Sequence, residues 1–221
     1  MRAREDILRN IRDSVRQAGG ADRGVSTASD PSEAYRSIPR AYREGPKRSP
    51  ADYLALFERM LHDYEATVVY ASRDGIAAAV AQRLEARSVT RIAIPRGLPH
   101  EWLPEGADFE RADDCSVAVL DRFQGVLTAC TLGIAETGTI VLQSGPSQGP
   151  RRLSLIPDYH LCVVFEGQVV ETVPEALARL STTATLPTTF ISGPSATSDI
   201  EMTRIRGVHG PRTLDVILVR G

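Results

Sequence analysis

The sequence predicts an α/β fold: an open, mainly parallel sheet covered by helices and preceded by an N-terminal arm. Short apolar runs alternate with helical patterns, which is typical of strand–helix–strand units. The runs are continuous instead of alternating with polar residues, as in strands buried on both faces. The 221 residues are 42% hydrophobic and 24% charged, so one large domain can build its own core.

Residues 1–49 are predicted to form the arm. Apolar residues at helical spacing among charges predict a short amphipathic helix over residues 3–18, with a narrow stripe of Ile7, Leu8, Ile11 and Val15. From Gly19 to Pro50 the chain is rich in Gly, Ser and Pro and carries five basic residues in its second half, Arg36, Arg40, Arg43, Lys47 and Arg48. Two interpretations remain open: a solvated linker, or a docking arm for an acidic partner.

The α/β domain is predicted to span residues 50–221. Pro50 opens a helix whose apolar side chains recur every three or four residues, at Leu54, Phe57, Leu61 and Tyr64. A strand at Thr67–Tyr70, a helix at Asp74–Ala86 and a strand at Arg91–Ile94 follow, ending at the break Pro95-Arg96-Gly97. We expect further strands at Ser116–Leu120, Thr139–Leu142, Leu161–Phe165 and Val216–Val219, and a covering helix at Glu171–Leu180 with Ala176, Leu177 and Leu180.

Composition argues against several classes of protein. The formal net charge is −2 and the pI is about 6.1, so nucleic acid is not expected as a main partner. The N-terminus is charged throughout and no apolar stretch approaches ~18 residues, which favours a cytoplasmic protein without membrane insertion. The sequence lacks the phosphate-binding loop motif, a dinucleotide-binding glycine motif after the first strand, the nucleophile-elbow motif of α/β-hydrolases and the H-E-x-x-H motif of zincins. The three cysteines, Cys115, Cys130 and Cys162, have no metal-site spacing, so neither a metal nor an iron–sulfur cluster is expected in this chain.

Glu136 is the first candidate for chemistry. It stands in the small-residue stretch Thr131–Thr139, just before an apolar run. A glutamate is costly to bury alone, so Glu136 is either a structural carboxylate satisfied by backbone N–H groups or an arginine, or a functional acid, base or ligand at a strand end. Its neighbours Thr137, Gly138 and Thr139 would leave room for a ligand beside it.

A repeated tetrapeptide, Ser-Gly-Pro-Ser, supplies candidate anion-binding residues. Each copy follows an apolar strand candidate. Each is either a structural turn without a binding role or a ligand-binding loop at the carboxyl edge of the sheet. A helix expected to start in Ala196–Glu201 would favour an anion at its N-terminus, although the acids of its first turn would compete. The arginines after the first copy suit bidentate capture of a carboxylate or phosphate. The candidates are Ser144, Gly145, Arg151, Arg152, Ser192, Gly193, Ser195 and Asp199.

His209 lies between Gly207 and Gly210, just before the last predicted strand. Its imidazole would titrate near neutral pH and is a candidate for proton transfer. The alternative is a loop histidine that is merely hydrogen-bonded.

Four of these segments together resemble the lactate-utilisation protein C family (LutC/YkgG), whose shared region is the LUD domain, here roughly Pro50–Arg220. They are Thr131–Thr139, Arg152–Pro157, Phe190–Glu201 and Gly207–Pro211. The family often has Ala-Glu-Ser-Gly where this chain has Ala135-Glu136-Thr137-Gly138, which preserves the hydroxyl. The resemblance implies a fold similar to the sugar-phosphate isomerase and CoA-transferase superfamily (NagB/RpiA/CoA transferase-like). It also implies a role in oxidising L-lactate to pyruvate beside cytoplasmic partner proteins that carry iron–sulfur clusters.

Three functional hypotheses follow. The first is a non-redox subunit that binds a small carboxylate such as lactate or pyruvate, or that bridges the iron–sulfur partners. In this hypothesis Arg151 or Arg152 and the Ser192–Ser195 loop bind the carboxylate. Glu136 and His209 then transfer protons. The second is a stand-alone enzyme acting on a sugar phosphate or an acyl-CoA through Glu136. The third is a regulatory or assembly module.

Overall fold

The computed structural model describes residues 2–18, 35–39, 45–198, 204–206 and 210–221. The chain divides into two compact units, Met1–Tyr42 and Arg43–Gly221. In the first unit, helix α1 (Arg2–Ala18) confirms the predicted N-terminal helix, and its apolar residues Ile7, Leu8 and Ile11 are exposed. No helix among the described residues is long and apolar enough to cross a membrane.

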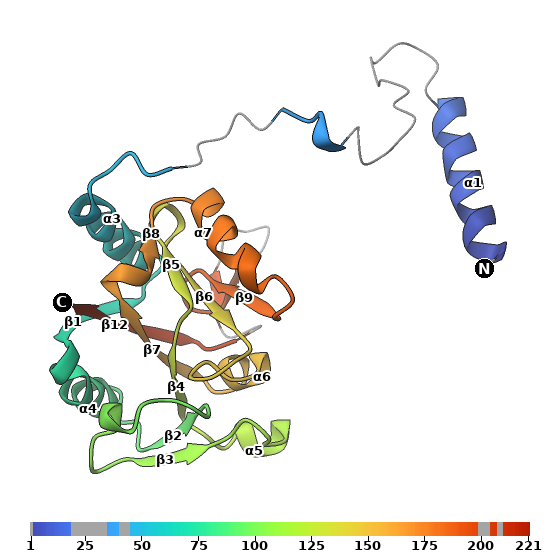
Figure 1. Cartoon of the computed structure of the whole chain (residues 1–221). Coiled ribbons are helices and arrows are strands. Elements are labelled where there is room, and N and C mark those ends of the chain that lie inside the picture. The colour runs from blue at the N-terminus through green and yellow to red at the C-terminus, as the bar shows by residue number, and fades with distance from the viewer. Residues whose placement is uncertain (1, 19–34, 40–44, 199–203, 207–209) are drawn as a thin grey trace. The chain divides into compact units, whose positions relative to one another are not determined.

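The second unit is built on a six-stranded sheet in which every neighbouring pair is parallel (Figure 1). The strand order is β1 (Thr67–Ser72), β12 (Thr213–Arg220), β7 (Tyr159–Phe165), β4 (Gly125–Ala129), β2 (Arg91–Ile94) and β3 (Asp108–Arg111). The central strands β12 and β7 are almost wholly buried, which explains their continuous apolar runs. The expected α/β fold with a parallel sheet is therefore confirmed.

The direction of the connections changes between β2 and β4. After β2 the chain runs outward through η2 (His100–Trp102) to the edge strand β3, and it returns through α5 (Val117–Leu120) to β4. After β4 the chain proceeds the other way, toward β7. The carboxyl ends of β2 and β4 therefore flank a topological switch point, where open α/β sheets leave a crevice for ligands.

The strands of a second, four-stranded sheet lie along the chain between β4 and β12 of the main sheet, on both sides of β7. Its order is β8 (Val169–Val170), β5 (Leu132–Ile134), β6 (Thr139–Gln143) and β9 (Thr188–Ile191), with antiparallel pairs on both sides of β6. The predicted strand at Thr139–Leu142 therefore exists, but it belongs to a mixed sheet, in which β6 pairs antiparallel with both neighbours and β5 pairs parallel with β8.

Two predicted elements are wrong. Ser116–Leu120 was expected to be a strand but forms the short helix α5, because the Ser116 carbonyl accepts the amides of Val119 and Leu120 and only Leu120 is fully buried. A helix was expected to start in Ala196–Glu201, but Ala196–Ser198 form strand β10, which pairs antiparallel with β11 (Arg204–Arg206), and residues 199–201 lie outside the described residues. The β-branched Thr197 of β10 suits an extended backbone.

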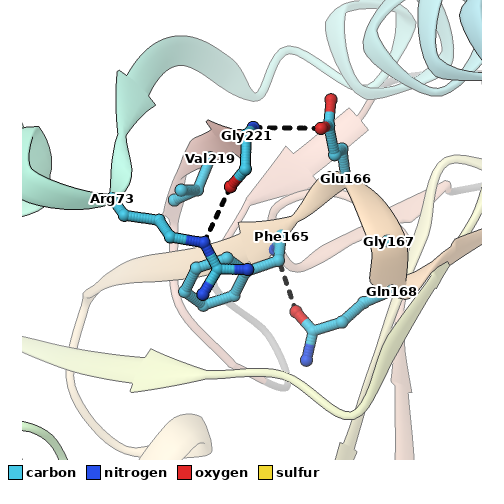
Figure 2. Close-up of a pocket in the computed structure, with 7 residues that line it drawn as sticks. All are labelled: Arg73, Phe165, Glu166, Gly167, Gln168, Val219 and Gly221. Carbon is cyan, nitrogen blue, oxygen red and sulfur yellow. Dashed lines mark hydrogen bonds between the residues drawn. The ribbon is translucent and has the colours of Figure 1, made fainter.

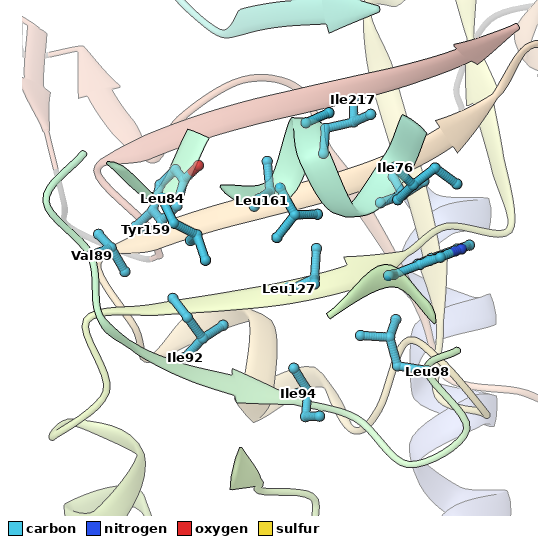
Figure 3. Close-up of a cluster of buried hydrophobic side chains, with 14 of the residues drawn as sticks. Ile76, Leu84, Val89, Ile92, Ile94, Leu98, Leu127, Tyr159, Leu161 and Ile217 are labelled. Carbon is cyan, nitrogen blue, oxygen red and sulfur yellow. The ribbon is translucent and has the colours of Figure 1, made fainter. Parts of the chain in front are cut away.

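Helices and the second sheet cover the two faces of the main sheet. On one face, α4 (Ile76–Ala86) follows η1 (Arg73–Gly75) and packs Ile76, Val80 and Leu84 against the strands (Figure 3). The other face is covered by α3 (Pro50–Asp63), α6 (Arg151–Leu155) and the inner face of the second sheet. Helix α3 begins where the sequence predicts, because the Ser49 hydroxyl accepts the Asp52 amide at 3.3 Å.

Helix α7 (Val173–Leu180) covers the outer face of the second sheet. It begins two residues after the predicted start, because Thr172 and Glu175 form a capping box. Ala176 and Leu180 are buried as expected, whereas Leu177 is exposed. Short helices η3 (Ala135–Thr137), η4 (Glu166–Gln168) and η5 (Ser181–Thr183) connect the strands.

Candidate functional site

A pocket of about 490 Å³ opens beside the switch point, at the carboxyl ends of β2 and β3. We call it the switch-point pocket. Three chain segments line it: the turn after β2, the turn after β3, and the loop from β6 together with the first turn of α6. Its lining residues are Arg96, Gly97, Asp113, Asp114, Ser144, Gly145, Pro146, Gly149, Pro150 and Arg152. Both its volume and its place in the fold are typical of small-molecule sites.

Ser147 holds the loop from β6 in the crevice between β2 and β4. Its amide donates to the Arg96 carbonyl at 2.7 Å and its hydroxyl to the Gly97 carbonyl at 2.6 Å, while its own carbonyl accepts the Ala129 amide at 2.8 Å. Its φ of 64° lies in the left-handed region, which is unusual for a residue with a side chain. Such strain persists where the surroundings fix the backbone, and it is concentrated at functional sites.

Two glycines let the walls of the pocket approach closely. A Cβ at Gly149 would lie 2.6 Å from Leu153 Cδ2 and 3.1 Å from Pro95 Cβ, and one at Gly97 would lie 3.0 Å from Pro146 Cβ. Both glycines have positive φ, 68° and 80°. No other residue type fits these two positions without displacing its neighbours.

The charged side chains of the pocket are paired across its rim. Arg96 forms a salt bridge with Asp114, and its backbone amide donates to Asp113 Oδ2 at 2.8 Å. The Arg152 guanidinium donates to the backbone carbonyl of Asp113. Because each of these contacts uses a single terminal nitrogen, both guanidinium groups keep further donors for a bound anion.

Three of the candidates named from sequence line this pocket together: Ser144, Gly145 and Arg152. Arg151 belongs to the same helix α6 but is not among the lining residues. The first Ser-Gly-Pro-Ser copy thus contributes to a cavity at the carboxyl edge of the main sheet, the place where the sequence suggested a ligand loop.

The second copy lies elsewhere, against helix α3. The Thr139 hydroxyl is 2.8 Å from the Ser192 hydroxyl and 2.7 Å from that of Thr137. A Cβ at Gly193 would lie 2.4 Å from Tyr64 Cβ, and one at Gly138 would lie 2.8 Å from the backbone of Met60. Gly138 and Gly193 therefore let α3 pack closely against this part of the molecule, whereas ligand binding by Thr137, Thr139 and Ser192 stays a prediction.

Glu136 belongs to a carboxylate pair beside the strap formed by residues 45–49. Its partner Glu171 is fully buried and accepts the amides of Lys47 and Arg48 at 2.6 and 3.0 Å. The Arg48 guanidinium lies 2.6 Å from Glu171 and 3.6 Å from Glu136. The Glu136 amide donates to the Glu171 carbonyl at 3.0 Å. The acidic group that binds the basic strap is thus part of the same chain, and Glu136 does not line the switch-point pocket.

Of the remaining candidates, the structure describes only Ser195, which is not among the residues that line the switch-point pocket. The Ser195 amide donates to the Pro211 carbonyl at 2.8 Å, which ties the second copy to the start of β12. Asp199 and His209 lie outside the described residues, so their predicted roles stay predictions.

A second pocket, of about 440 Å³, lies at the carboxyl ends of β1, β12 and β7 (Figure 2). The Arg73 guanidinium lies 5.1 Å from the centroid of the Phe165 ring, and its Nε donates to the Gly221 carbonyl at 2.7 Å. Glu166 accepts the Gly221 amide at 3.0 Å. None of the candidates from sequence lines this pocket.

A buried charge cluster stabilises the opposite edge of the main sheet. Asp215 accepts hydrogen bonds from Arg83 and Arg87 of α4 and from the Tyr159 hydroxyl. Burial alone would raise the pKa of Asp215, but the two arginines hold it below its ordinary value. Burial and the nearby Asp215 raise the pKa of Tyr159. This cluster joins α4 to the sheet near the amino ends of β7 and β12, whereas both pockets lie at the carboxyl ends of the strands.

Three of the four charged lining residues are not among the candidates from sequence: Arg96, Asp113 and Asp114. Arg96 was visible as part of a Pro-Arg-Gly break directly after a predicted strand, which is the signal of a carboxyl-edge turn. The two aspartates follow β3, whose sequence Asp-Phe-Glu-Arg gives no strand pattern because it is an exposed edge.

Comparison with known proteins gives a consistent result. A family model described as the LUD domain matches residues 118–219. Lactate utilization protein C of Deinococcus radiodurans is 45% identical over 174 residues, which cover 77% of this chain and 81% of that protein. The uncharacterized protein YkgG of Escherichia coli is 38% identical over 85 residues, 36% of each chain.

A solved structure, described as a DUF162 family protein from Deinococcus radiodurans, superimposes with a TM-score of 0.68 at 40% identity. The match covers 79% of this chain and 99% of that one. Family-level identity over most of a relative's length, together with the same fold, confirms the resemblance seen in the sequence motifs. The chain belongs to the lactate utilization protein C family, whose shared region is the LUD domain.

Proposed function

We propose that this chain is the non-redox, carboxylate-binding component of a system that oxidises L-lactate to pyruvate. The observation that carries the proposal is the pair of arginines, Arg96 and Arg152, that line a pocket at the switch point of the main sheet. The family name points to lactate: the relatives in Deinococcus radiodurans and Bacillus subtilis are lactate utilization proteins C. Oxidation to pyruvate is the reaction that we propose for this system.

The pocket suits a small carboxylate. A guanidinium group presents paired N–H donors that match the two oxygens of a carboxylate, and this match favours arginine over lysine. Arg96 and Arg152 come from different elements, and Gly145, Pro146 and Gly149 line the same pocket. A carboxylate that bridges the two guanidinium groups would therefore rest on a wall fixed by Ser147 and the two glycines.

The electrons are proposed to leave through partner proteins. Oxidation of lactate to pyruvate releases two electrons and two protons, and a four-thiolate iron–sulfur cluster needs one cysteine more than this chain contains. Cys130 and Cys162 are buried in the core, with Cys162 3.8 Å from the Thr128 hydroxyl. We therefore assign the iron–sulfur clusters to the partner proteins implied by the family resemblance.

We further propose a cytoplasmic location and kinship with the sugar-phosphate isomerase and CoA-transferase superfamily.

Two adjacent arginines provide the test. L-lactate-dependent pyruvate formation is measured in cells that carry Arg152→Ala or, as a matched control on the same helix, Arg151→Ala. Protein abundance and pull-down of the partners are followed in parallel. We expect Arg152→Ala to lower pyruvate formation at least tenfold with the complex intact, and Arg151→Ala to leave it close to wild type. Wild-type pyruvate formation in Arg152→Ala cells contradicts the proposal.

Bridging of the partners is a second candidate role. The exposed fractions of Ile7, Leu8 and Ile11 on α1 are 59%, 40% and 54%, so this helix presents an apolar stripe to a partner. Replacing Ile7 and Ile11 by Glu should abolish pull-down of the partners if the arm assembles the complex. Unchanged pull-down would remove the bridging role.

A stand-alone enzyme that acts through Glu136 is favoured less by the geometry, because this carboxylate faces Arg48 instead of a pocket arginine. Turnover of a sugar phosphate or an acyl-CoA by the isolated chain, lost in Glu136→Gln, would restore that alternative.

A further inference from the structure

Donors and acceptors stand next to one another around the switch-point pocket. The guanidinium groups of Arg96 and Arg152 can only donate hydrogen bonds, whereas the carboxylates of Asp113 and Asp114 supply acceptor oxygens. A ligand that fills this lining needs an acidic group for the arginines and, close to it, a group that donates a hydrogen bond.

Asp113 is the acceptor that the structure positions best. Its Oδ2 accepts the Arg96 amide at 2.8 Å, which fixes the plane of the carboxylate. Its Oδ1 lies on the wall of the pocket, 3.5 Å from the position that a Cβ at Gly149 would occupy. The backbone carbonyl of the same residue accepts a hydrogen bond from Arg152. Asp113 is thus held between the two arginines that are proposed to bind the ligand carboxylate.

We infer that the switch-point pocket selects 2-hydroxy acids over 2-oxo acids, with Asp113 accepting the hydroxyl hydrogen of the ligand. This inference rests on the proposed function, because it needs a ligand carboxylate on Arg96 or Arg152. The α-hydroxyl of such a ligand is next to the carboxylate and donates to Asp113 Oδ1. The keto oxygen of a 2-oxo acid has only lone pairs, which the Asp113 carboxylate repels.

The preference has a consequence for the reaction. A component that binds the hydroxy acid more tightly than the oxo acid retains the substrate and releases the product once oxidation has removed the hydroxyl hydrogen. Because the pocket is partly open to solvent, we expect a preference of about tenfold, well below what a fully buried hydroxyl site reaches.

The test compares three acids with the same three-carbon skeleton on the full chain. Dissociation constants for L-lactate, pyruvate and propionate are measured by ligand-observed NMR on wild type, on Asp113→Asn and on the matched control Asp121→Asn. Asp121 is exposed at the end of α5 and is not part of the pocket lining. Thermal unfolding of each variant is recorded as a check on folding.

Wild type and Asp121→Asn should bind L-lactate about tenfold more tightly than pyruvate, and propionate should bind more weakly than L-lactate. In Asp113→Asn the amide nitrogen donates to a keto oxygen, so the preference for lactate should vanish or reverse. Equal or tighter binding of pyruvate by wild type overturns the inference but leaves the carboxylate site intact. Failure of all three acids to bind refutes the proposed function itself. If Asp113→Asn does not fold, the wild-type ratio decides.

Discussion

The two Ser-Gly-Pro-Ser copies give identical sequences in different environments, and the same substitution should affect them very differently. Gly193 has a φ of 79°, and a Cβ there would lie 2.4 Å from Tyr64 Cβ and 3.2 Å from the Tyr64 carbonyl. A Cβ at Gly145 would have nothing within 4 Å, and Gly145 is not among the residues of positive φ.

The cost of Gly193→Ala has two parts. A left-handed backbone costs a residue with a Cβ about 1–2 kcal/mol, and overpacking of a filled site costs about 1–3 kcal/mol. The free energy of unfolding should therefore fall by roughly 2–5 kcal/mol in Gly193→Ala, a large part of a typical domain's stability. Gly145→Ala should change it by less than about 0.5 kcal/mol.

Urea denaturation followed by circular dichroism measures both variants against wild type. A lower midpoint with an unchanged slope in Gly193→Ala, beside a wild-type midpoint in Gly145→Ala, is the expected pattern. Equal losses in the two variants, or none in Gly193→Ala, would refute the conclusion that the second copy serves α3 packing.

Three further predictions concern the ion pairs and the strained loop. Asp215→Asn should lower the free energy of unfolding by about 3–5 kcal/mol, because two arginines lose their partner. The pKa of Asp215 is lowered in the folded state, so its contribution to stability is complete above the unfolded pKa near 3.9 and is lost as pH falls toward the folded pKa. The acid limb of a stability–pH curve should therefore be flatter in the variant than in wild type. Glu171→Gln should lower the free energy of unfolding by about 3 kcal/mol and speed proteolysis next to Arg48, because the buried carboxylate holds the strap of residues 45–49. A wild-type cleavage rate in limited proteolysis would contradict this prediction. Ser147→Gly should be less destabilising than Ser147→Ala in thermal melts, because both lose the hydrogen bond to Gly97 but only glycine relieves the positive φ; the reverse order would show that the loop is not strained.

Local patterns predicted the buried elements well. The apolar stripe of α3 and the continuous runs of β7 and β12 each reflect a face, or two faces, in contact with the core. Prediction failed where burial is one-sided. Strand β3 exposes charged residues at the sheet edge, and α5 is an apolar run that buries Leu120 but leaves Val117 exposed.

The site was only partly predictable, because its members meet through topology. Ser144 and Arg152 could be proposed from turn chemistry and charge, but the position of Asp113 depends on β3 lying beside β2. Identical tetrapeptides carry no information about which one reaches the pocket. The buried partner of Arg48 was equally hidden, since Glu171 is 123 residues away in the chain.

The central claim is that a small carboxylate binds at the switch-point pocket, and chemical-shift mapping tests it most directly. The full ¹⁵N-labelled chain is titrated with L-lactate. The account predicts that the largest saturable shifts fall on the amides of Arg96, Gly145, Gly149 and Arg152, which belong to the pocket lining. Shifts centred on Glu136 and Arg48, or no saturable shifts at all, would contradict it.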